Sequence, residues 1–122
     1  MAGVRVIMGI STHILDTALG RPVSDVGLKL FEFRDNPAGG TWHEIGSGHT
    51  DADGRCKTLL GSHPLRATDY KIYFVTSEYF SSQKLPSLYP YVEIVFTVAD
   101  PAQHYHIPLL LTANGYTTYR GS

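Results

Sequence analysis

The sequence predicts an all-β protein. Short runs rich in β-branched and aromatic residues alternate with Gly, Pro, Asn and Asp turns at near-regular intervals, as in an antiparallel sandwich or barrel. Several runs alternate apolar and polar residues with the period of two of a half-buried strand, and none sustains a helical period. With 122 residues, 43% hydrophobic and 17% charged, the chain is expected to form a single domain over residues 1–122.

Three strands are expected in the first half of the chain, over residues 7–15, 26–33 and 42–49. Each contains β-branched or aromatic residues, which fit a pleated surface. Each also ends before residues that favour turns, which are Gly20-Arg21-Pro22, the loop 35–40 and Asp51-Ala52-Asp53-Gly54.

The second half predicts four further strands. They are 70–76, 91–98, 104–111 and a final strand after the turn at Asn114-Gly115. A proline-containing connector at 85–90 precedes the second of them, and Asp100-Pro101-Ala102 precedes the third. At most one short helix is expected, near 64–69.

Strand 91–98 shows the clearest alternation, and it also bears on assembly. Val92, Ile94 and Phe96 share one face, whereas Tyr91 and Val95 are apolar residues on the opposite face. A lone sandwich of this size should leave one face of each sheet to water. We therefore expect the second face to be covered by another subunit of a homo-oligomer.

Charge and composition exclude several classes of partner. The formal net charge is -1, from 10 basic and 11 acidic residues, and no basic run offers a surface for nucleic acid or a membrane. The first residues lack the apolar core of a signal peptide, and no stretch approaches the roughly 18 apolar residues of a membrane span. We expect a cytoplasmic protein, with the peroxisome as the alternative. Cys56, the single cysteine, is expected to be a half-buried apolar residue rather than a reactive thiol.

Histidines are the main candidates for chemistry. In the strand 104–111, His104 and His106 should share one face while the intervening apolar residues face the core. His13 should lie on the face of its own strand opposite its apolar neighbours. Pro108 cannot donate a backbone hydrogen bond to a ladder, so we expect this strand to have a free N–H side nearby.

These histidines suit either acid–base catalysis or metal binding. A His-x-His pair can present two imidazoles to a metal, but spacing identifies no third ligand. Asp51-Ala52-Asp53-Gly54 resembles part of a calcium loop, yet His49 and Leu60 occupy positions that would need oxygen ligands. No nucleotide-binding loop or nucleophilic serine elbow follows any strand. Histidine as acid or base, with arginines that bind an anion or a polarised carbonyl, is the favoured chemistry.

Four segments carry a family resemblance. They are Ser11-Thr12-His13-Ile14-Leu15-Asp16 with Gly20-Arg21-Pro22, then Asp53-Gly54-Arg55, then His104-Tyr105-His106-Ile107-Pro108-Leu109-Leu110-Leu111, and finally Tyr119-Arg120-Gly121-Ser122. In this order they resemble the 5-hydroxyisourate hydrolases, the transthyretin-like enzymes of urate degradation. The stretches 111–115 and 62–67 depart from the usual pattern, which puts the shape of those loops in doubt.

The resemblance implies a transthyretin-like β-sandwich of two four-stranded sheets, assembled as a homotetramer with active sites in a central channel. It also implies hydrolysis of 5-hydroxyisourate to 2-oxo-4-hydroxy-4-carboxy-5-ureidoimidazoline without a metal or an organic cofactor. The catalytic positions of the family fall on His13, Arg55, His106, Tyr119 and Arg120, and substrate binding adds Gly121 and Ser122.

Two questions stay open at the level of sequence. Either His13 or His106 could be the general base, with the other as positioning partner or proton donor, and His104 is a looser candidate. The alternative function is a transthyretin-type carrier that uses the same channel for a small ligand. The charged and polar residues expected in the channel disfavour that alternative.

Overall fold

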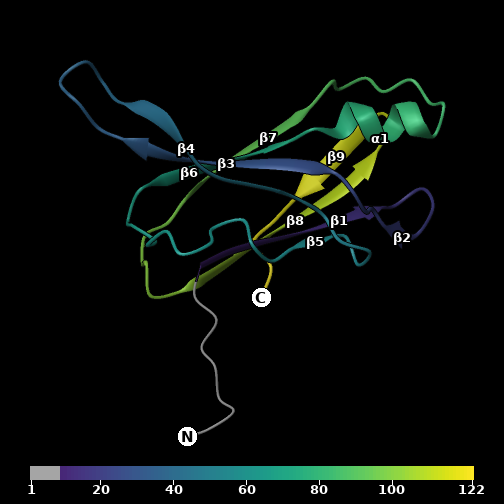
Figure 1. Ribbon diagram of the computed structural model, residues 1–122. Coiled ribbons are helices and arrows are strands. Elements are labelled where there is room, and N and C mark those ends of the chain that lie inside the picture. The colour runs from purple at the N-terminus through teal and green to yellow at the C-terminus, as the bar shows by residue number, and fades with distance from the viewer. Residues whose placement is uncertain (1–8) are drawn as a thin grey trace, which may run out of the picture.

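The computed structural model describes residues 9–122, which form a sandwich of two β-sheets (Figure 1). The elements are β1 (Gly9–Asp16), β2 (Arg21–Pro22), β3 (Gly27–Arg34), β4 (Thr41–His49), β5 (Arg55–Cys56), β6 (Asp69–Phe74), α1 (Thr76–Ser82), β7 (Val92–Thr97), β8 (His104–Thr112) and β9 (Gly115–Thr118). The all-β prediction is confirmed. The first expected strand began at residue 7, and its first two residues lie outside the described part of the chain.

The two sheets differ in their connectivity. One has the order β4-β3-β6-β7, and all of its neighbours are antiparallel. The other has the order β2-β1-β8-β9, with the two-residue strand β5 as an additional partner of β1. In this second sheet β1 and β8 are parallel, so two segments that are far apart in sequence become direct neighbours.

The expected helix near 64–69 is wrong, and the helix lies at α1 instead. It follows β6 directly, so the expected strand 70–76 is shorter than predicted. With only seven residues, α1 is too short to show a helical period, and it depends on tertiary contacts. Phe80 is buried in the core, and the hydroxyl of Tyr79 donates to Oδ2 of Asp16 on β1 at 2.6 Å.

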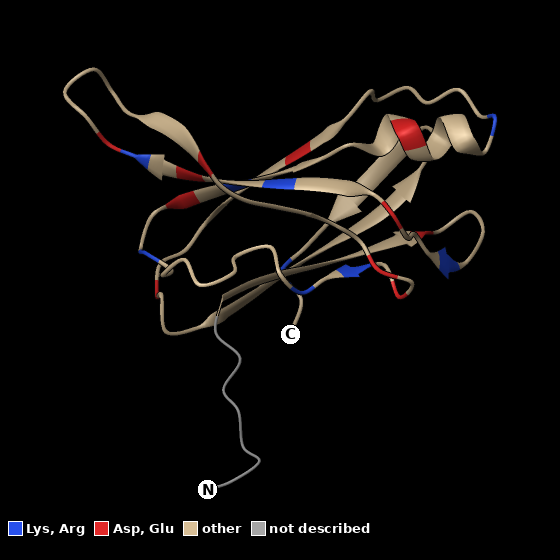
Figure 2. Ribbon diagram, in the orientation of Figure 1, with Lys and Arg blue, Asp and Glu red and all other residues tan. Residues whose placement is uncertain are grey.

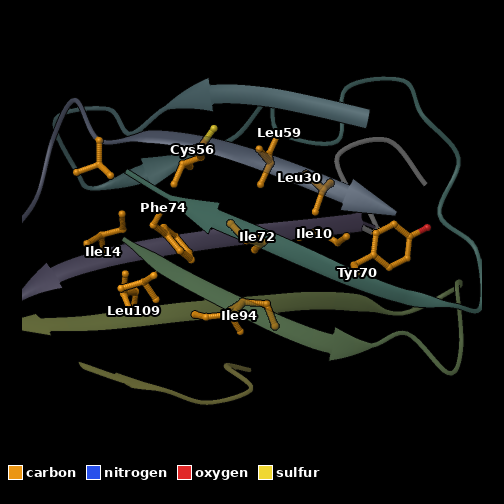
Figure 3. Close-up of a cluster of buried hydrophobic side chains, with 14 of the residues drawn as sticks. Ile10, Ile14, Leu30, Cys56, Leu59, Tyr70, Ile72, Phe74, Ile94 and Leu109 are labelled. Atoms are coloured by element: carbon orange, nitrogen blue, oxygen red, sulfur yellow. The ribbon is translucent and has the colours of Figure 1, made fainter. Parts of the chain in front are cut away.

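The core lies between the two sheets and draws side chains from both (Figure 3). Ile14 and Leu109 come from the β1–β8 sheet, and Leu30, Ile72 and Phe74 come from the other; all five are fully buried. Each such side chain contributes about 1.5–3 kcal/mol through its removal from water. The opposite faces of these strands are free to carry polar groups.

A buried carboxylate fixes one long loop to the sandwich. Glu32 of β3 accepts hydrogen bonds from the Tyr70 hydroxyl at 2.8 Å, from Arg34 Nε at 3.0 Å and from His63 Nε2 at 3.1 Å. Burial alone would raise the pKa of Glu32, but these bonds favour the carboxylate and hold the pKa below its usual value. Burial raises the pKa of the Tyr70 phenol to about 12. The loop between β5 and β6, which includes His63, is thereby held in one position.

Charged residues are spread over the molecule without a patch of one sign (Figure 2). Strands β8 and β9 contain no Lys, Arg, Asp or Glu, so this part of the sheet exposes neutral polar and apolar groups. No helix in the described part of the chain is long and apolar enough to cross a membrane.

Candidate active site

The parallel pairing of β1 with β8 assembles the centre of the site. Ser11 lies opposite His106 in the register, and Gly9 lies opposite His104. The residues that alternate with them, among them Ile10 and Tyr105, are buried in the core. Ser11, His104 and His106 therefore project from the face of the sheet that points away from the core, as the alternation in sequence predicted for the two histidines.

The hydroxyl of Ser11 joins the two histidines. Its Oγ lies 2.7 Å from Nε2 of His104 and 2.8 Å from Nδ1 of His106. Sequence analysis did not single out Ser11. The signal was available, because Ser11 and His13 share one face of the same strand. What the sequence could not provide was the register that places Ser11 beside His106.

His106 is surrounded by groups that disfavour its protonated form. Burial lowers the pKa of its imidazole first, and the positive charge of Arg55 and the neighbouring His104 and His13 lower this pKa further. The neutral ring is therefore the main form near pH 7. A neutral imidazole can accept a proton at one nitrogen or donate a hydrogen bond from the other.

Arg55 is positioned by the tight turn before β5. Oδ1 of Asp51 accepts hydrogen bonds from the backbone N–H of Asp53 at 2.9 Å and of Arg55 at 3.1 Å. Gly54 has φ of 78°, and a Cβ there would lie 2.5 Å from the carbonyl oxygen of Ile14, so only glycine fits. Arg55 then pairs with His13 across the β1–β5 ladder. The segment that resembled a calcium loop is instead the turn that carries the arginine.

The C-terminal segment reaches the site by continuing along β8 past Pro108. In the β8–β9 register Pro108 lies opposite Tyr119, and the ladder ends at Leu109 and Thr118 because proline has no N–H to donate. Pairing resumes at a single bridge, in which the backbone N–H of Gly121 donates to the carbonyl of His106 at 2.8 Å. The expected free side of this strand is not present, because β8 lies inside the sheet between β1 and β9, and the effect of Pro108 is limited to this interruption of the β8–β9 ladder.

These groups line a cavity of about 810 Å³. Among the residues expected from the family resemblance, five line it: Arg55, His106, Tyr119, Gly121 and Ser122. His104, the looser candidate, lines it as well. Ser11, Lys57 and Leu60 also line it, and none of these three was predicted from the sequence as a site residue. Cys56 contributes to the wall but is 2% exposed, so it is more deeply buried than expected.

Two expected residues are not in the cavity lining. His13 lies beside it, paired with Arg55 and close enough for its charge to affect His106. Arg120 points elsewhere: its Nη2 donates to Oε1 of Gln103 at 2.9 Å, and its guanidinium lies 4.4 Å from the centre of the Tyr105 ring. It lines a smaller hollow of about 280 Å³ between β7 and the C-terminal segment. Successive side chains of an extended segment point to opposite sides, so Arg120 points away from the cavity that its neighbours Tyr119 and Gly121 line.

The polar side chains do not form a metal site. Within residues 9–122, no group of three or more His, Cys, Asp or Glu side chains is arranged to hold a metal ion. The cavity instead combines the neutral imidazole of His106 and the ring of His104 with the cations Arg55 and Lys57. This arrangement can activate water and stabilise negative charge on an oxygen.

A model of the HIUase/Transthyretin family matches residues 10–121. The chain belongs to this family. The 5-hydroxyisourate hydrolase of Mus musculus is 42% identical over 113 residues, which cover 93% of this chain and 94% of that protein.

Solved structures of the family share the fold. Sea bream transthyretin in complex with thyroxine has a TM-score of 0.82 at 30% identity, covering 92% of this chain and 93% of that one. The 5-hydroxyisourate hydrolase of Klebsiella pneumoniae has a TM-score of 0.75 at 29% identity, covering 93% and 92%. The chain thus resembles both a hydrolase and a transthyretin that is in complex with thyroxine.

Proposed function

We propose that this protein hydrolyses 5-hydroxyisourate to 2-oxo-4-hydroxy-4-carboxy-5-ureidoimidazoline in urate degradation. The observation that carries the proposal is the convergence of His106, Arg55, Tyr119, Gly121 and Ser122 on one cavity. Relatives named 5-hydroxyisourate hydrolase support the same activity.

The reaction requires three functions that the site can supply. Water attacks an acyl carbon of the planar bicyclic substrate, so a base must accept a proton from water. The attacked carbonyl oxygen gains negative charge, which hydrogen-bond donors and cations stabilise. A ring nitrogen then leaves and must receive a proton. His13 and His106 divide the roles of base and partner, and Arg55 stabilises the developing charge.

The remaining cavity groups orient the substrate. The Tyr119 hydroxyl and the Ser122 hydroxyl can bind ring oxygens or nitrogens at the cavity wall. Lys57 adds a second cation, which favours a carbonyl-rich or anionic ligand. The Arg120 side chain is bound to Gln103 outside this cavity, so it is not placed to contact a ligand there.

A transthyretin-type carrier function is the alternative, and the cavity disfavours it. A hydrophobic ligand would lie against the two imidazoles and two cations that line this cavity beside its apolar residues. A ligand without matching polar groups would leave these side chains desolvated and unpaired.

We also propose that the protein assembles as a homotetramer in the cytosol. Exposed apolar side chains cluster on β7, β9 and the adjoining segments: Leu88, Tyr89, Tyr91, Val95, Tyr116 and Tyr119. The rings of Tyr89 and Tyr116 are in contact, with centroids 5.3 Å apart, and exposed apolar groups that lie together are typical of a protein interface. Light scattering coupled to size exclusion tests the mass, and a monomer at micromolar concentration would contradict the assembly.

One assay tests the activity directly. Urate oxidase generates 5-hydroxyisourate in the cuvette, the purified protein is added, and the ultraviolet absorbance of the intermediate is followed. We expect decay much faster than spontaneous hydrolysis. A rate equal to the spontaneous one would exclude the hydrolase.

A further inference from the structure

The hydroxyl between His104 and His106 can donate to only one of them. Ser11 carries a single hydrogen, and both imidazole nitrogens lie within 2.8 Å of its oxygen. Its oxygen could accept from both rings, but its hydrogen has no other acceptor within residues 9–122, so it points to one of the two rings and the other ring donates to the oxygen. Two directions are possible, and they leave His106 in opposite tautomers.

The second nitrogen of His104 distinguishes the two directions. Nδ1 of His104 is buried and has no hydrogen-bond partner in the described part of the chain. If Ser11 donated to Nε2 of His104, the neutral ring would carry its hydrogen on this buried Nδ1, as an unsatisfied N–H. In the opposite direction Nε2 carries the hydrogen and Nδ1 is a bare lone pair. Buried N–H groups without a partner are the rarer and costlier case.

We propose that Ser11 and His104 hold His106 in its Nε2–H tautomer, so that His106 is a neutral hydrogen-bond donor to the carbonyl oxygen under attack rather than the base. The chain of donation runs from Nε2 of His104 to Ser11, and from Ser11 to Nδ1 of His106. This inference rests on the proposed function, and it decides which of His13 and His106 is the base. Ser11 and His104 are positioning residues, since they act through His106.

The surroundings of His106 suit such a donor. Burial, Arg55, His104 and His13 lower the pKa of its imidazole and keep it neutral. Nε2 of His106 has no partner within residues 9–122, and it is not among their buried unsatisfied atoms, so it can reach a ligand in the cavity. A neutral imidazole with a lowered pKa can polarise a carbonyl without transferring its proton.

The role of base then falls on His13. No proton leaves His106 during attack, so the proton of the water must go to another group. His13 shares the face of β1 with Ser11 and lies beside Arg55. Arg55 and Lys57 also line the cavity, but as cations they cannot accept a proton at neutral pH.

Glutamine substitutions can distinguish a histidine that donates a hydrogen bond from one that acts as a base. A glutamine amide can present an N–H near the position of Nε2, but it cannot accept a proton from water. We expect H106A to lower kcat by about 10²–10³-fold, as for loss of an oxyanion donor, and H106Q by only about 10-fold. At position 13, H13Q and H13A should be equally impaired, by about 10²–10⁴-fold. If H106Q is as impaired as H106A, His106 is not a donor and the proposal fails.

Ser11 variants test the positioning role. S11A should lower kcat about 10-fold with KM changed less than 2-fold, because one hydrogen bond contributes about a factor of ten to the balance of tautomers. S11T keeps the hydroxyl and should recover most of this loss. If S11A is unchanged, or if S11T is no better than S11A, Ser11 does not act through its hydroxyl.

A spectroscopic test is independent of activity. Long-range 1H–15N correlation on imidazole-labelled protein distinguishes Nδ1–H from Nε2–H in each histidine. We expect the Nε2–H form for His106 in the parent protein, and a mixture in S11A. The Nδ1–H form in the parent would overturn the proposal even in an active enzyme. An inactive parent with the expected tautomer would instead contradict the hydrolase function.

Discussion

Gly121 and His106 face each other so closely that no side chain fits between them. The N–H of Gly121 donates to the carbonyl of His106 at 2.8 Å, and a Cβ on Gly121 would lie 2.4 Å from Cδ2 of the His106 ring. G121A must therefore displace either the ring or the C-terminal segment. We expect kcat to fall at least about 10²-fold, since misplacement of catalytic groups by about 1 Å has this effect.

The control for G121A is G115A on the same segment. A Cβ at Gly115 would meet only Oγ1 of Thr112, at 4.0 Å, so this variant should keep its activity. Both variants should unfold at nearly the parent temperature. Equal activities of G121A and G115A would show that contact with His106 does not matter for catalysis.

Removal of residues 119–122 should abolish activity and preserve the sandwich. The core is complete without them, because Leu111 is the last residue of the buried hydrophobic core and Tyr119 is 54% exposed. Circular dichroism and the melting temperature should stay close to those of the parent, whereas kcat/KM should fall to the background. An active truncated protein would remove Tyr119, Gly121 and Ser122 from the site.

R55E should be among the most damaging single substitutions. It replaces a cation that stabilises negative charge with a repulsive carboxylate, and we expect kcat/KM to fall by more than about 10²-fold. The pKa of His106 should rise at the same time, since Arg55 is one cause of its lowering. An NMR titration that shows an unchanged or lower pKa in R55E would contradict this electrostatic coupling.

Glu32 should make stability dependent on pH in the acid range. Its folded pKa is lowered, so its contribution is fully present above the ordinary value of 4.5 and is lost as the pH falls through the folded pKa. The free energy of unfolding of E32Q should be lower by about 2 kcal/mol or more at pH 7, because hydrogen bonds to a charged group are replaced by weaker ones. Below the ordinary pKa of Glu32, the stability of E32Q should depend less on pH than that of the parent. E44Q removes only a half-exposed ion pair with Lys29 and should stay within about 0.5 kcal/mol of the parent.

Chelation should leave the activity unchanged. His104 and His106 lack a third ligand of metal type in the described part of the chain. Prolonged dialysis against EDTA, followed by the decay assay, checks this expectation. Loss of activity that zinc restores would show that the two histidines bind a metal after all.

Local pattern predicted most of the strands and the outward face of His104 and His106, because alternation depends only on neighbouring residues. It did not predict α1, which is too short to show a period and depends on Phe80 and Tyr79 contacts with the sandwich. It also missed Ser11, whose importance depends on the pairing of β1 with β8. Arg120 was assigned to the site by resemblance, but its side chain is held by Gln103 on the other side of the segment. Contacts between distant segments are what the sequence alone leaves undetermined.

The parallel pairing of β1 and β8 also sets a delay during synthesis. Ser11 and His104 are 93 residues apart, so β1 leaves the ribosome long before its partner exists. At about 5–20 residues per second, the strand waits roughly 5 to 20 s with its apolar face uncovered. Only when β8 emerges can the sheet close and the imidazoles meet. Nascent chains that stall before this point carry no catalytic centre and leave the β8 edge of β1 unpaired, which makes them substrates for chaperones or proteases.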